Sequence, residues 1–232
     1  MSDILLSMKD LVIEAEVDGL WTPIVKSLSM SLRKGEIIGL IGESGAGKST
    51  FGLAAMGYTK PGCRIVSGSI SLEGEELVGA RTSRLRQIRG DTVAYVAQSA
   101  AASFNPAHRL IHQFSEAPVQ HGKMRQEEAE RRGVDLYGQL DLPEPEKIGR
   151  RFPHQVSGGQ LQRAMTAMAM GCDPRLIIFD EPTTALDVTT QIEVLSTIKE
   201  AVRARGVSAI YITHDLAVVA QVADRIMVLR HG

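Results

Sequence analysis

The sequence predicts an α/β fold in which helices cover both faces of a parallel sheet. Short apolar runs bounded by polar or glycine residues indicate buried strands. They are "EIIGLI" (36–41), "TVAYVA" (92–97), "RLIIF" (175–179), "SAIYIT" (208–213) and "RIMVLR" (225–230). Helical patterns at 188–205, with Ile192, Leu195, Ile198 and Val202 facing inward, and at 215–222 alternate with the last strands. Buried strands that alternate with helices are typical of a parallel sheet.

Two other parts of the chain have different patterns. Residues 3–17 and 22–33 alternate or run apolar, and "SGSISLEG" (67–74) alternates as an antiparallel strand does, which predicts an antiparallel β part. Residues 98–156 lack a strong strand pattern, contain five prolines and include the charged amphipathic stretch "RQEEAERRGVDLYGQL". We therefore expect a helical insertion over 98–156.

Composition limits the class of protein. The chain has 232 residues, 44% of them hydrophobic and 23% charged, as is usual for a globular protein in water. The net charge of −1 argues against binding nucleic acid through bulk electrostatics. No apolar run is long enough to span a bilayer, and the N-terminus "MSDILLSMKD" does not resemble a signal peptide. Two cysteines, Cys63 and Cys172, form no disulfide framework, which favours a reducing cytosol.

The stretch "GESGAGKST" (42–50) fits the phosphate-binding pattern G-x-x-x-x-G-K-[ST], and it follows a predicted strand and precedes a predicted helix. Its glycines allow several backbone N–H groups to point at one phosphate chain, and the start of the helix adds its positive end. Lys48 is expected to supply a charge to the β and γ oxygens, and the Ser49 hydroxyl can serve as a ligand for Mg²⁺. The candidate nucleotide-binding residues are Gly42, Glu43, Ser44, Gly45, Ala46, Gly47, Lys48, Ser49 and Thr50.

The stretch "LIIFDE" (176–181) is a buried strand that ends in two carboxylates. Ligands of open α/β sheets bind at the carboxyl ends of the strands. Asp180 is therefore expected to hold Mg²⁺, directly or through water. Glu181 is expected to act as the general base on an attacking water.

The stretch "QVSGGQLQRAMTAMAM" (155–170) predicts a helix with one apolar face. Ser157 is the expected N-cap, and Gln160 completes a capping box. Gly158 and Gly159 nevertheless occupy the first turn, where glycine lowers helix stability. No nucleophile, base or metal ligand stands beside them, so their purpose is a question that the local pattern leaves open.

Five motifs together resemble those of an ATP-binding-cassette (ABC) ATPase domain over essentially the whole chain. "VSGGQ" (156–160) resembles the signature loop of that family, Gln98 its Q-loop glutamine, "ALD" (185–187) its D-loop and His214 its switch histidine, beside the phosphate loop. The resemblance implies a P-loop NTPase (RecA-like) core with an antiparallel β part over 1–97 and 157–232, and a helical subdomain over 98–156. "SFNP" (103–106), "RRFPHQVSGGQLQR" and "THDLAVVAQVADRI" look like the importer group for oligopeptides, dipeptides and nickel.

The resemblance also implies roles for the remaining residues. In the family two domains pack head to tail, and each ATP lies between the P-loop of one and the signature loop of the other. Gln98 is then a contact to Mg²⁺ or the attacking water, His214 holds the γ-phosphate and orients Glu181, and Asp187 lies at the dimer interface. The signature residues that bind the γ-phosphate are Ser157, Gly158, Gly159 and Gln160.

One position departs from the family pattern. The family usually stacks adenine on an aromatic residue at the end of the first strand, where "LVIEAEVDGLWTP" places Ala15 or Glu16. Trp21, the only tryptophan, stands farther along and could supply the aromatic face or could pack within a hairpin. The sequence leaves both alternatives, and with them the base selectivity, open.

The expected function is that of an ATP-binding and ATP-hydrolysing subunit that energises a membrane importer for peptides or a similar solute, with ATP and Mg²⁺ as cofactors. Its expected partners are transmembrane permease subunits, a second ABC ATPase domain in a homo- or heterodimer and, indirectly, a solute-binding protein. No nucleic-acid partner is expected, and the expected location is peripheral, on the cytoplasmic face of the inner or plasma membrane.

Two alternatives belong to other classes. A soluble ABC ATPase acting on ribosomes or DNA usually has two cassettes joined by a charged linker, or long coiled-coil insertions, and neither feature is found here. A non-hydrolysing cassette is disfavoured because Lys48, Asp180, Glu181 and His214 are all present. The chain ends on "RIMVLRHG", where the family continues with another strand, so we expect a fragment of a longer chain.

Overall fold

A computed structural model describes residues 3–184 and 186–232. The chain forms two compact units, which are described separately. The first unit combines the chain up to Arg89 with Ser208–Gly232, and the second is Gly90–Val207. Residues 157–207, expected in the nucleotide-binding core, therefore lie in the same unit as the helices of 98–156, and the subdomain boundary drawn from the sequence stays a prediction.

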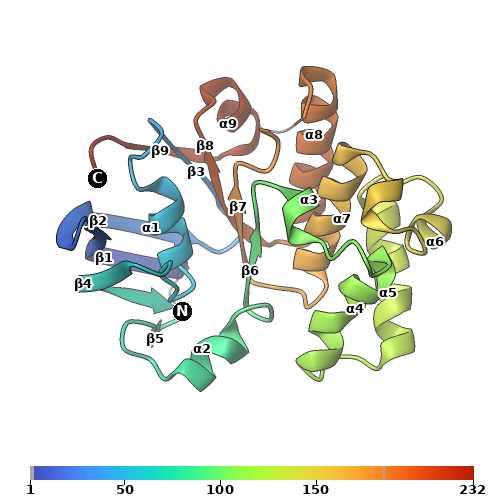
Figure 1. Cartoon of the computed structure of the whole chain (residues 1–232), viewed down its shortest axis with the longest axis horizontal. Helices are drawn as coiled ribbons and strands as arrows, with labels where there is room; N and C mark the ends of the chain where they lie inside the picture. The colour runs from blue at the N-terminus through green and yellow to red at the C-terminus, as the bar shows by residue number, and fades with distance from the viewer. Residues whose placement is uncertain (1–2, 185) are drawn as a thin grey trace. The chain divides into compact units, whose positions relative to one another are not determined.

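The first unit contains an antiparallel sheet in the order β2-β1-β4-β5. Its strands are β1 (Ile4–Val17), β2 (Leu20–Arg33), β4 (Cys63–Leu72) and β5 (Glu75–Glu76) (Figure 1). Asp18 and Gly19, both with positive φ, connect β1 and β2 as a two-residue hairpin turn. Ile13 pairs with Val25 on one side and with Ile65 on the other. Because Ile13 and Val25 are fully buried, this face of the hairpin belongs to the core.

The first unit also contains three parallel strands. β3 (Ile37–Gly42) pairs with β8 (Ser208–Thr213) and with β9 (Arg225–Leu229). The helices of this unit are α1 (Lys48–Ala54), α2 (Thr82–Ile88) and α9 (Leu216–Val222). α9 packs so closely on β3 that a Cβ at Gly39 would lie 1.9 Å from Cγ2 of Val219. Glycine is therefore required in the strand that leads to the phosphate loop.

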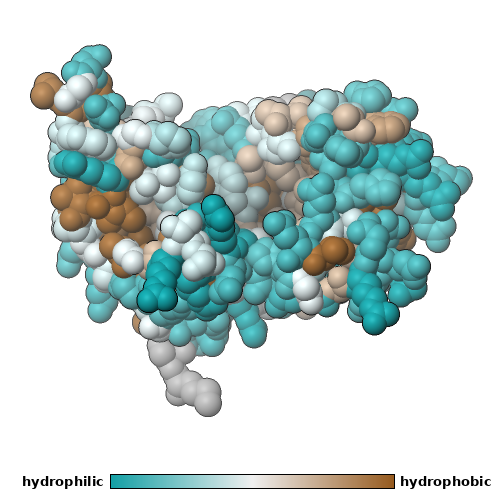
Figure 2. Space-filling model, turned by 60° about the horizontal axis from the view of Figure 1, so that its bottom comes forward, coloured by the Kyte–Doolittle hydropathy of each residue, from teal (hydrophilic) through white to brown (hydrophobic). Residues whose placement is uncertain are grey.

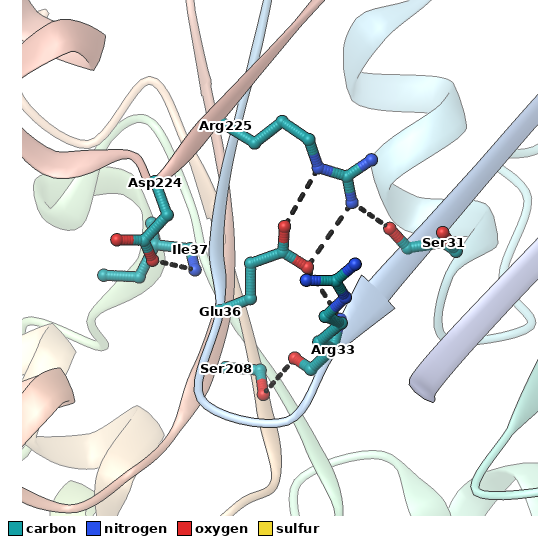
Figure 3. Close-up of polar contacts among 7 residues, drawn as sticks. All are labelled: Ser31, Arg33, Glu36, Ile37, Ser208, Asp224 and Arg225. Atoms are coloured by element: carbon teal, nitrogen blue, oxygen red, sulfur yellow. Dashed lines mark hydrogen bonds and ion pairs between the residues drawn. The ribbon is translucent and has the colours of Figure 1, made fainter. Parts of the chain in front are cut away.

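A cluster of polar contacts fixes the amino end of β3 (Figure 3). Glu36 accepts hydrogen bonds from the backbone N–H of Arg33 at 2.7 Å and from Nε of Arg225 at 2.9 Å. The N–H of Ile37 donates to Asp224 at 2.9 Å. These bonds connect the end of β2 and the start of β9 to β3, so the strand that carries the phosphate loop is anchored at its opposite end.

The second unit pairs two parallel strands, β6 (Val93–Val96) and β7 (Leu176–Asp180). Its helices are α3 (Ala100–Ser103), α4 (Leu110–Gln120), α5 (Gln126–Gln139), α6 (Pro145–Ile148), the 3₁₀ turn η1 (Pro153–Gln155), α7 (Gly158–Met170) and α8 (Val188–Ala204). α7 is the central helix, in contact with β6 and with α3, α4, α5 and α8. Accordingly, even its polar side chains Gln162 and Thr166 are buried.

The buried face of α8 differs in part from the expected one. Leu195, Ile198 and Val202 are buried as predicted, but Ile192 is 52% exposed. The prediction for Ile192 is wrong because Val194, which is fully buried, occupies the inward position of that turn. Ile192 lies about 120° around the helix from Ile198, outside the apolar stripe.

The surface in Figure 2 is mostly hydrophilic, with apolar side chains in small separate groups. The most exposed large apolar residues of the first unit include Leu20, at 72%, and Val228, at 67%. Over residues 3–184 and 186–232, we find no helix with the length and apolar character needed to cross a membrane.

Candidate functional site

The loop between β3 and α1 has a backbone that only glycine permits at two positions. A Cβ at Gly42 would lie 2.1 Å from the carbonyl oxygen of Leu229, and one at Gly47 would lie 2.7 Å from that of Ile24. Gly47 is also in the left-handed region, with φ 89°. The loop is thus confined between β9 and the β1–β2 hairpin, and its curled backbone is the form that a phosphate cradle needs.

Lys48 begins α1 and is only 5% exposed. Its Nζ donates hydrogen bonds to the carbonyl oxygens of Gly42, at 2.8 Å, and Glu43, at 2.9 Å. The ammonium therefore lies across the loop and not in solvent. Ser49 and Thr50 follow in the first turn of the helix, both half-buried. In this position the lysine can place its charge against phosphate oxygens held by the loop.

His214 follows β8 at the same edge of the parallel strands as the phosphate loop. Ile41 of β3 is aligned with Thr213 of β8, so the next residues, Gly42 and His214, are neighbours in register. The His214 side chain is exposed. Asp215, immediately after it, caps α9 by accepting the N–H of Ala217 at 2.8 Å. The first unit thus brings His214 and the phosphate loop to one strand edge.

In the second unit, Asp180 ends β7 and is 6% exposed. The hydroxyl of Tyr95, on β6, donates a hydrogen bond of 2.7 Å to Oδ2 of Asp180. Burial, and then the hydrogen bond and charge of Asp180, raise the pKa of Tyr95 well above its usual value, so the phenol stays protonated and remains a donor. Tyr95 was not among the residues expected from the sequence.

Glu181 is held by two side chains. Gln98 Nε2 and Thr184 Oγ1 each donate to Oε2 of Glu181 at 3.2 Å. The backbone of Glu181 is in the left-handed region, with φ 48°, although Pro182 follows it and proline favours an extended predecessor. Such a conformation costs about 1–3 kcal/mol and is commonest at functional sites. The second unit therefore joins Gln98 to Glu181 and adds Thr184, which the sequence pattern did not indicate.

The start of α7 has the capping box expected from the sequence. Ser157 Oγ accepts the N–H of Gln160 at 3.3 Å, and Gln160 Oε1 accepts the N–H of Ser157 at 3.0 Å. A Cβ at Gly159 would lie 2.6 Å from Cγ2 of Thr190 on α8, whereas one at Gly158 would meet Leu186 at an ordinary 3.4 Å. Close packing therefore explains why residue 159 is glycine, but it does not explain why residue 158 is glycine.

Asp187 caps α8. Its carboxylate accepts hydrogen bonds from the N–H of Thr190 at 3.1 Å and from the Thr190 hydroxyl at 2.7 Å. These two bonds hold the pKa of Asp187 below its usual value. Of the expected D-loop residues, Ala185 lies outside the described part of the chain.

Trp21 faces away from the phosphate loop. It pairs with Glu16 across the hairpin, and the guanidinium of Arg64 lies 3.9 Å from its ring centroid. Arg64 in turn donates to Glu14 at 2.8 Å. Successive residues of a strand point to opposite faces, so Glu14, Glu16 and Trp21 share one face, and Ile13 and Ala15 share the other. This arrangement supports the packing alternative for the tryptophan.

The face of the hairpin that carries Ala15 is the one that meets the loop. Ala15 pairs with Thr22 and Cys63, and it lies on the same face as Val25, which pairs with Ile13. Cγ2 of Val25 would be 3.3 Å from a Cβ at Gly47. Ala15 and its two strand partners, Thr22 and Cys63, place no aromatic ring on this face of the hairpin.

Comparison with known families identifies the class of protein. A family model described as "ABC transporter" matches residues 25–184, more than half of the chain. The chain belongs to the ABC transporter family. This match confirms the family resemblance that the five sequence motifs indicated.

Among its relatives is the oligopeptide transport ATP-binding protein OppD of Lactococcus lactis subsp. lactis (strain IL1403), 39% identical over 231 residues that cover 100% of this chain and 68% of that protein. The probable D,D-dipeptide transport ATP-binding protein DdpD of Escherichia coli (strain K12) is 40% identical over 209 residues, 90% of this chain and 64% of that protein. The chain thus spans about two thirds of the length of these relatives.

A solved structure with a similar fold is the dimeric post-hydrolysis state of the ATP-binding cassette MJ0796 bound to ADP and phosphate. It has a TM-score of 0.85 and 25% identity, and the match covers 98% of this chain and 95% of that one. The predicted fold class, a P-loop core with parallel strands, an antiparallel β part and helices, is confirmed.

Proposed function

We propose that this chain binds and hydrolyses ATP to energise a membrane importer of peptides or similar solutes. The observation that carries the proposal is the pair of adjacent carboxylates at the end of β7. Asp180 is buried and bonded to Tyr95, and Glu181 is held by Gln98 and Thr184. The phosphate loop with its buried Lys48 supplies the complementary binding element. The proposed solute class follows the names of the two relatives, which are peptide-transport proteins.

Binding of ATP begins at the phosphate loop. The N–H groups of the curled loop donate to the phosphate oxygens, and Lys48 exchanges its bonds to the carbonyls of Gly42 and Glu43 for stronger ones to charged oxygens. Ser49, Asp180 and Gln98 offer only oxygen ligands, the set that Mg²⁺ prefers, and Mg²⁺ when bound neutralises charge on the β and γ oxygens. Within the described ranges no cluster of three His, Cys, Asp or Glu side chains could hold a metal.

Hydrolysis requires a base and charge stabilisation. Glu181 accepts a proton as a water oxygen attacks the γ-phosphorus, and the bond from that phosphorus to the β–γ bridging oxygen breaks to release ADP and inorganic phosphate. Lys48 and His214 hold the γ-phosphate oxygens. Gln98 and Thr184 orient the carboxylate of Glu181, which they already contact.

The signature loop acts on a second copy or a second cassette. Ser157, Gly158, Gly159 and Gln160 would receive the γ-phosphate bound to the partner's loop, through bare N–H groups at the start of α7, with Asp187 at the same interface. In this proposal no nucleophile is needed beside the glycines, because their part is closure and charge stabilisation.

The helical region 98–156 is proposed to dock the permease. It contains α3 to α6 and a groove of about 760 Å³ lined by charged side chains of both signs, among them Arg109, Glu127, Arg131 and Arg150. Such a surface suits a short polar helix of a membrane protein. The proposal places the chain on the cytoplasmic face of the membrane, with a solute-binding protein acting only through the permease. Crosslinks from the permease concentrated in 60–90 would contradict this part.

The central experiment traps the ATP-bound dimer. Glu181→Gln keeps the shape of the side chain but cannot take a proton, so we expect nucleotide binding without hydrolysis and an ATP-dependent dimer in sedimentation velocity. Adding Ser157→Arg should abolish the dimer, because the bulky arginine side chain would block the helix start that faces the partner's phosphates. Nucleotide binding by each monomer should persist.

Two control variants distinguish steric blocking of the dimer from loss of the helix cap and from loss of nucleotide binding. Ser157→Ala removes the cap, a loss of about 1 kcal/mol, without adding bulk, so in the Glu181→Gln background it should still dimerise with ATP. Lys48→Ala should abolish nucleotide binding itself. A Ser157→Arg variant that dimerises with ATP as well as its parent would refute the shared site.

A further inference from the structure

The hydroxyl of Tyr95 donates a hydrogen bond to the buried carboxylate of Asp180. In the parallel register, Tyr95 of β6 is aligned with Ile178 of β7, two residues before Asp180. The tyrosine side chain spans this offset, about 7 Å along a strand, and its hydroxyl reaches Oδ2 of Asp180 at 2.7 Å. No shorter polar side chain at position 95 would make this contact.

The charge of the hydrogen-bond donor affects how strongly a carboxylate can bind a cation. Asp180 is 6% exposed, and a buried carboxylate is stable only when it accepts hydrogen bonds. A lysine or arginine would supply them but would also cancel the negative charge. A neutral phenol fixes one oxygen of the carboxylate and leaves its charge available to a divalent cation.

We propose that Tyr95 is a positioning residue for the metal site, which it serves by holding the Asp180 carboxylate in the orientation that receives Mg²⁺. The inference rests on the proposed function, because it assigns the metal contact to Asp180. Ligating carboxylates commonly depend on such outer partners, and loss of one typically lowers metal affinity about 10- to 100-fold. Tyr95 then raises the affinity of the site for Mg²⁺ without contacting the nucleotide.

The experiment compares Tyr95→Phe with Tyr137→Phe. Tyr137, on α5 of the same unit, is fully buried, and its hydroxyl has no hydrogen-bond partner among the described residues, so its variant removes the same atom without breaking a bond. Two quantities are measured: Mn²⁺ binding by electron paramagnetic resonance in the presence of ATP, and ATP affinity in Mg²⁺ and in EDTA.

We expect Tyr95→Phe to weaken Mn²⁺ binding by about 10-fold and to reduce the gain in ATP affinity that Mg²⁺ gives, with the affinity in EDTA unchanged. Tyr137→Phe should match the wild type in each measurement. Equal Mn²⁺ binding by the two variants would overturn the inference. An equal loss of ATP affinity with and without Mg²⁺ would also overturn it, by showing a general structural role. Failure of the proposed function is a separate result, in which the unmodified protein itself binds no ATP.

Discussion

Gln98 donates a hydrogen bond to Glu181 at 3.2 Å, and Thr184 donates to the same oxygen at the same distance. Oε2 of the proposed general base is thus fixed from two directions. Gln98 follows β6 and Thr184 follows β7, so two separate segments determine where the carboxylate points. Gln98 also has a proposed role toward the metal, whereas Thr184 is given no other role. Thr184 is therefore the better position for a test of orientation alone.

Replacing Thr184 by Val should lower kcat for ATP hydrolysis by about 10-fold, in line with the loss of one hydrogen bond to a charged group. Valine has nearly the same shape as threonine and removes only the donor. ATP affinity should change little, because the bond orients the base and does not contact the nucleotide. The measurement is steady-state ATPase activity together with equilibrium ATP binding.

Thr184→Ser is the matched control, since it keeps the hydroxyl and should retain most of the activity. If Thr184→Val and Thr184→Ser hydrolyse ATP at the same rate, the bond to Glu181 has no part in catalysis.

Sequence reasoning located the strands and the phosphate loop because these are local patterns. β3, β7 and β8 are short apolar runs, and the loop motif follows directly from one of them. Tyr95 could not be found in this way, because its partner depends on the register between strands separated by about eighty residues of chain. Thr184 lies in a loop whose backbone is set by the left-handed conformation of Glu181, which no local pattern indicates.

Gly159 is a residue that the sequence pattern pointed out without giving the reason for it. The sequence correctly marked it as unusual, but its neighbour Thr190 belongs to another helix, so the steric reason required coordinates. The exposure of Ile192 also depends on contacts between elements. The face of α8 that is buried contains Val194, whereas the predicted buried face contained Ile192.

Replacing Trp21 by Ala should leave ATP affinity unchanged within about twofold, because the indole lies on the opposite face of the hairpin from Ala15 and is covered by Arg64. The free energy of unfolding should fall, with the cation–π contact contributing about 0.5–1 kcal/mol. Calorimetric titration with ATP and urea unfolding measure the two quantities.

Ala15→Tyr provides the converse variant. An aromatic ring at that position would face the phosphate loop, and stacking on adenine should strengthen ATP binding by about 1–3 kcal/mol. The assignment of faces is wrong if Trp21→Ala weakens ATP binding by that amount and ATP changes the tryptophan fluorescence.

Replacing Gly159 by Ala should destabilise the protein by about 1–3 kcal/mol, the range for overpacking a close contact. The added Cβ would lie 2.6 Å from the Thr190 methyl. Thr190→Ser removes that methyl but keeps the hydroxyl that bonds to Asp187. The double variant Gly159→Ala/Thr190→Ser should therefore recover most of the lost stability, which urea unfolding of the four proteins in the cycle would show as a coupling energy.

Gly158→Ala separates packing from ligand binding at the same helix start. Its Cβ would meet only the flexible end of Leu186, at 3.4 Å, and alanine is the better helix former by about 1 kcal/mol, so stability should hold or rise. In the Glu181→Gln background, however, the methyl group would stand where the partner's γ-phosphate is proposed to bind, and the ATP-dependent dimer should weaken. A Gly158→Ala protein that is stable and still dimerises as well as its parent would show that the partner's γ-phosphate does not require glycine at position 158.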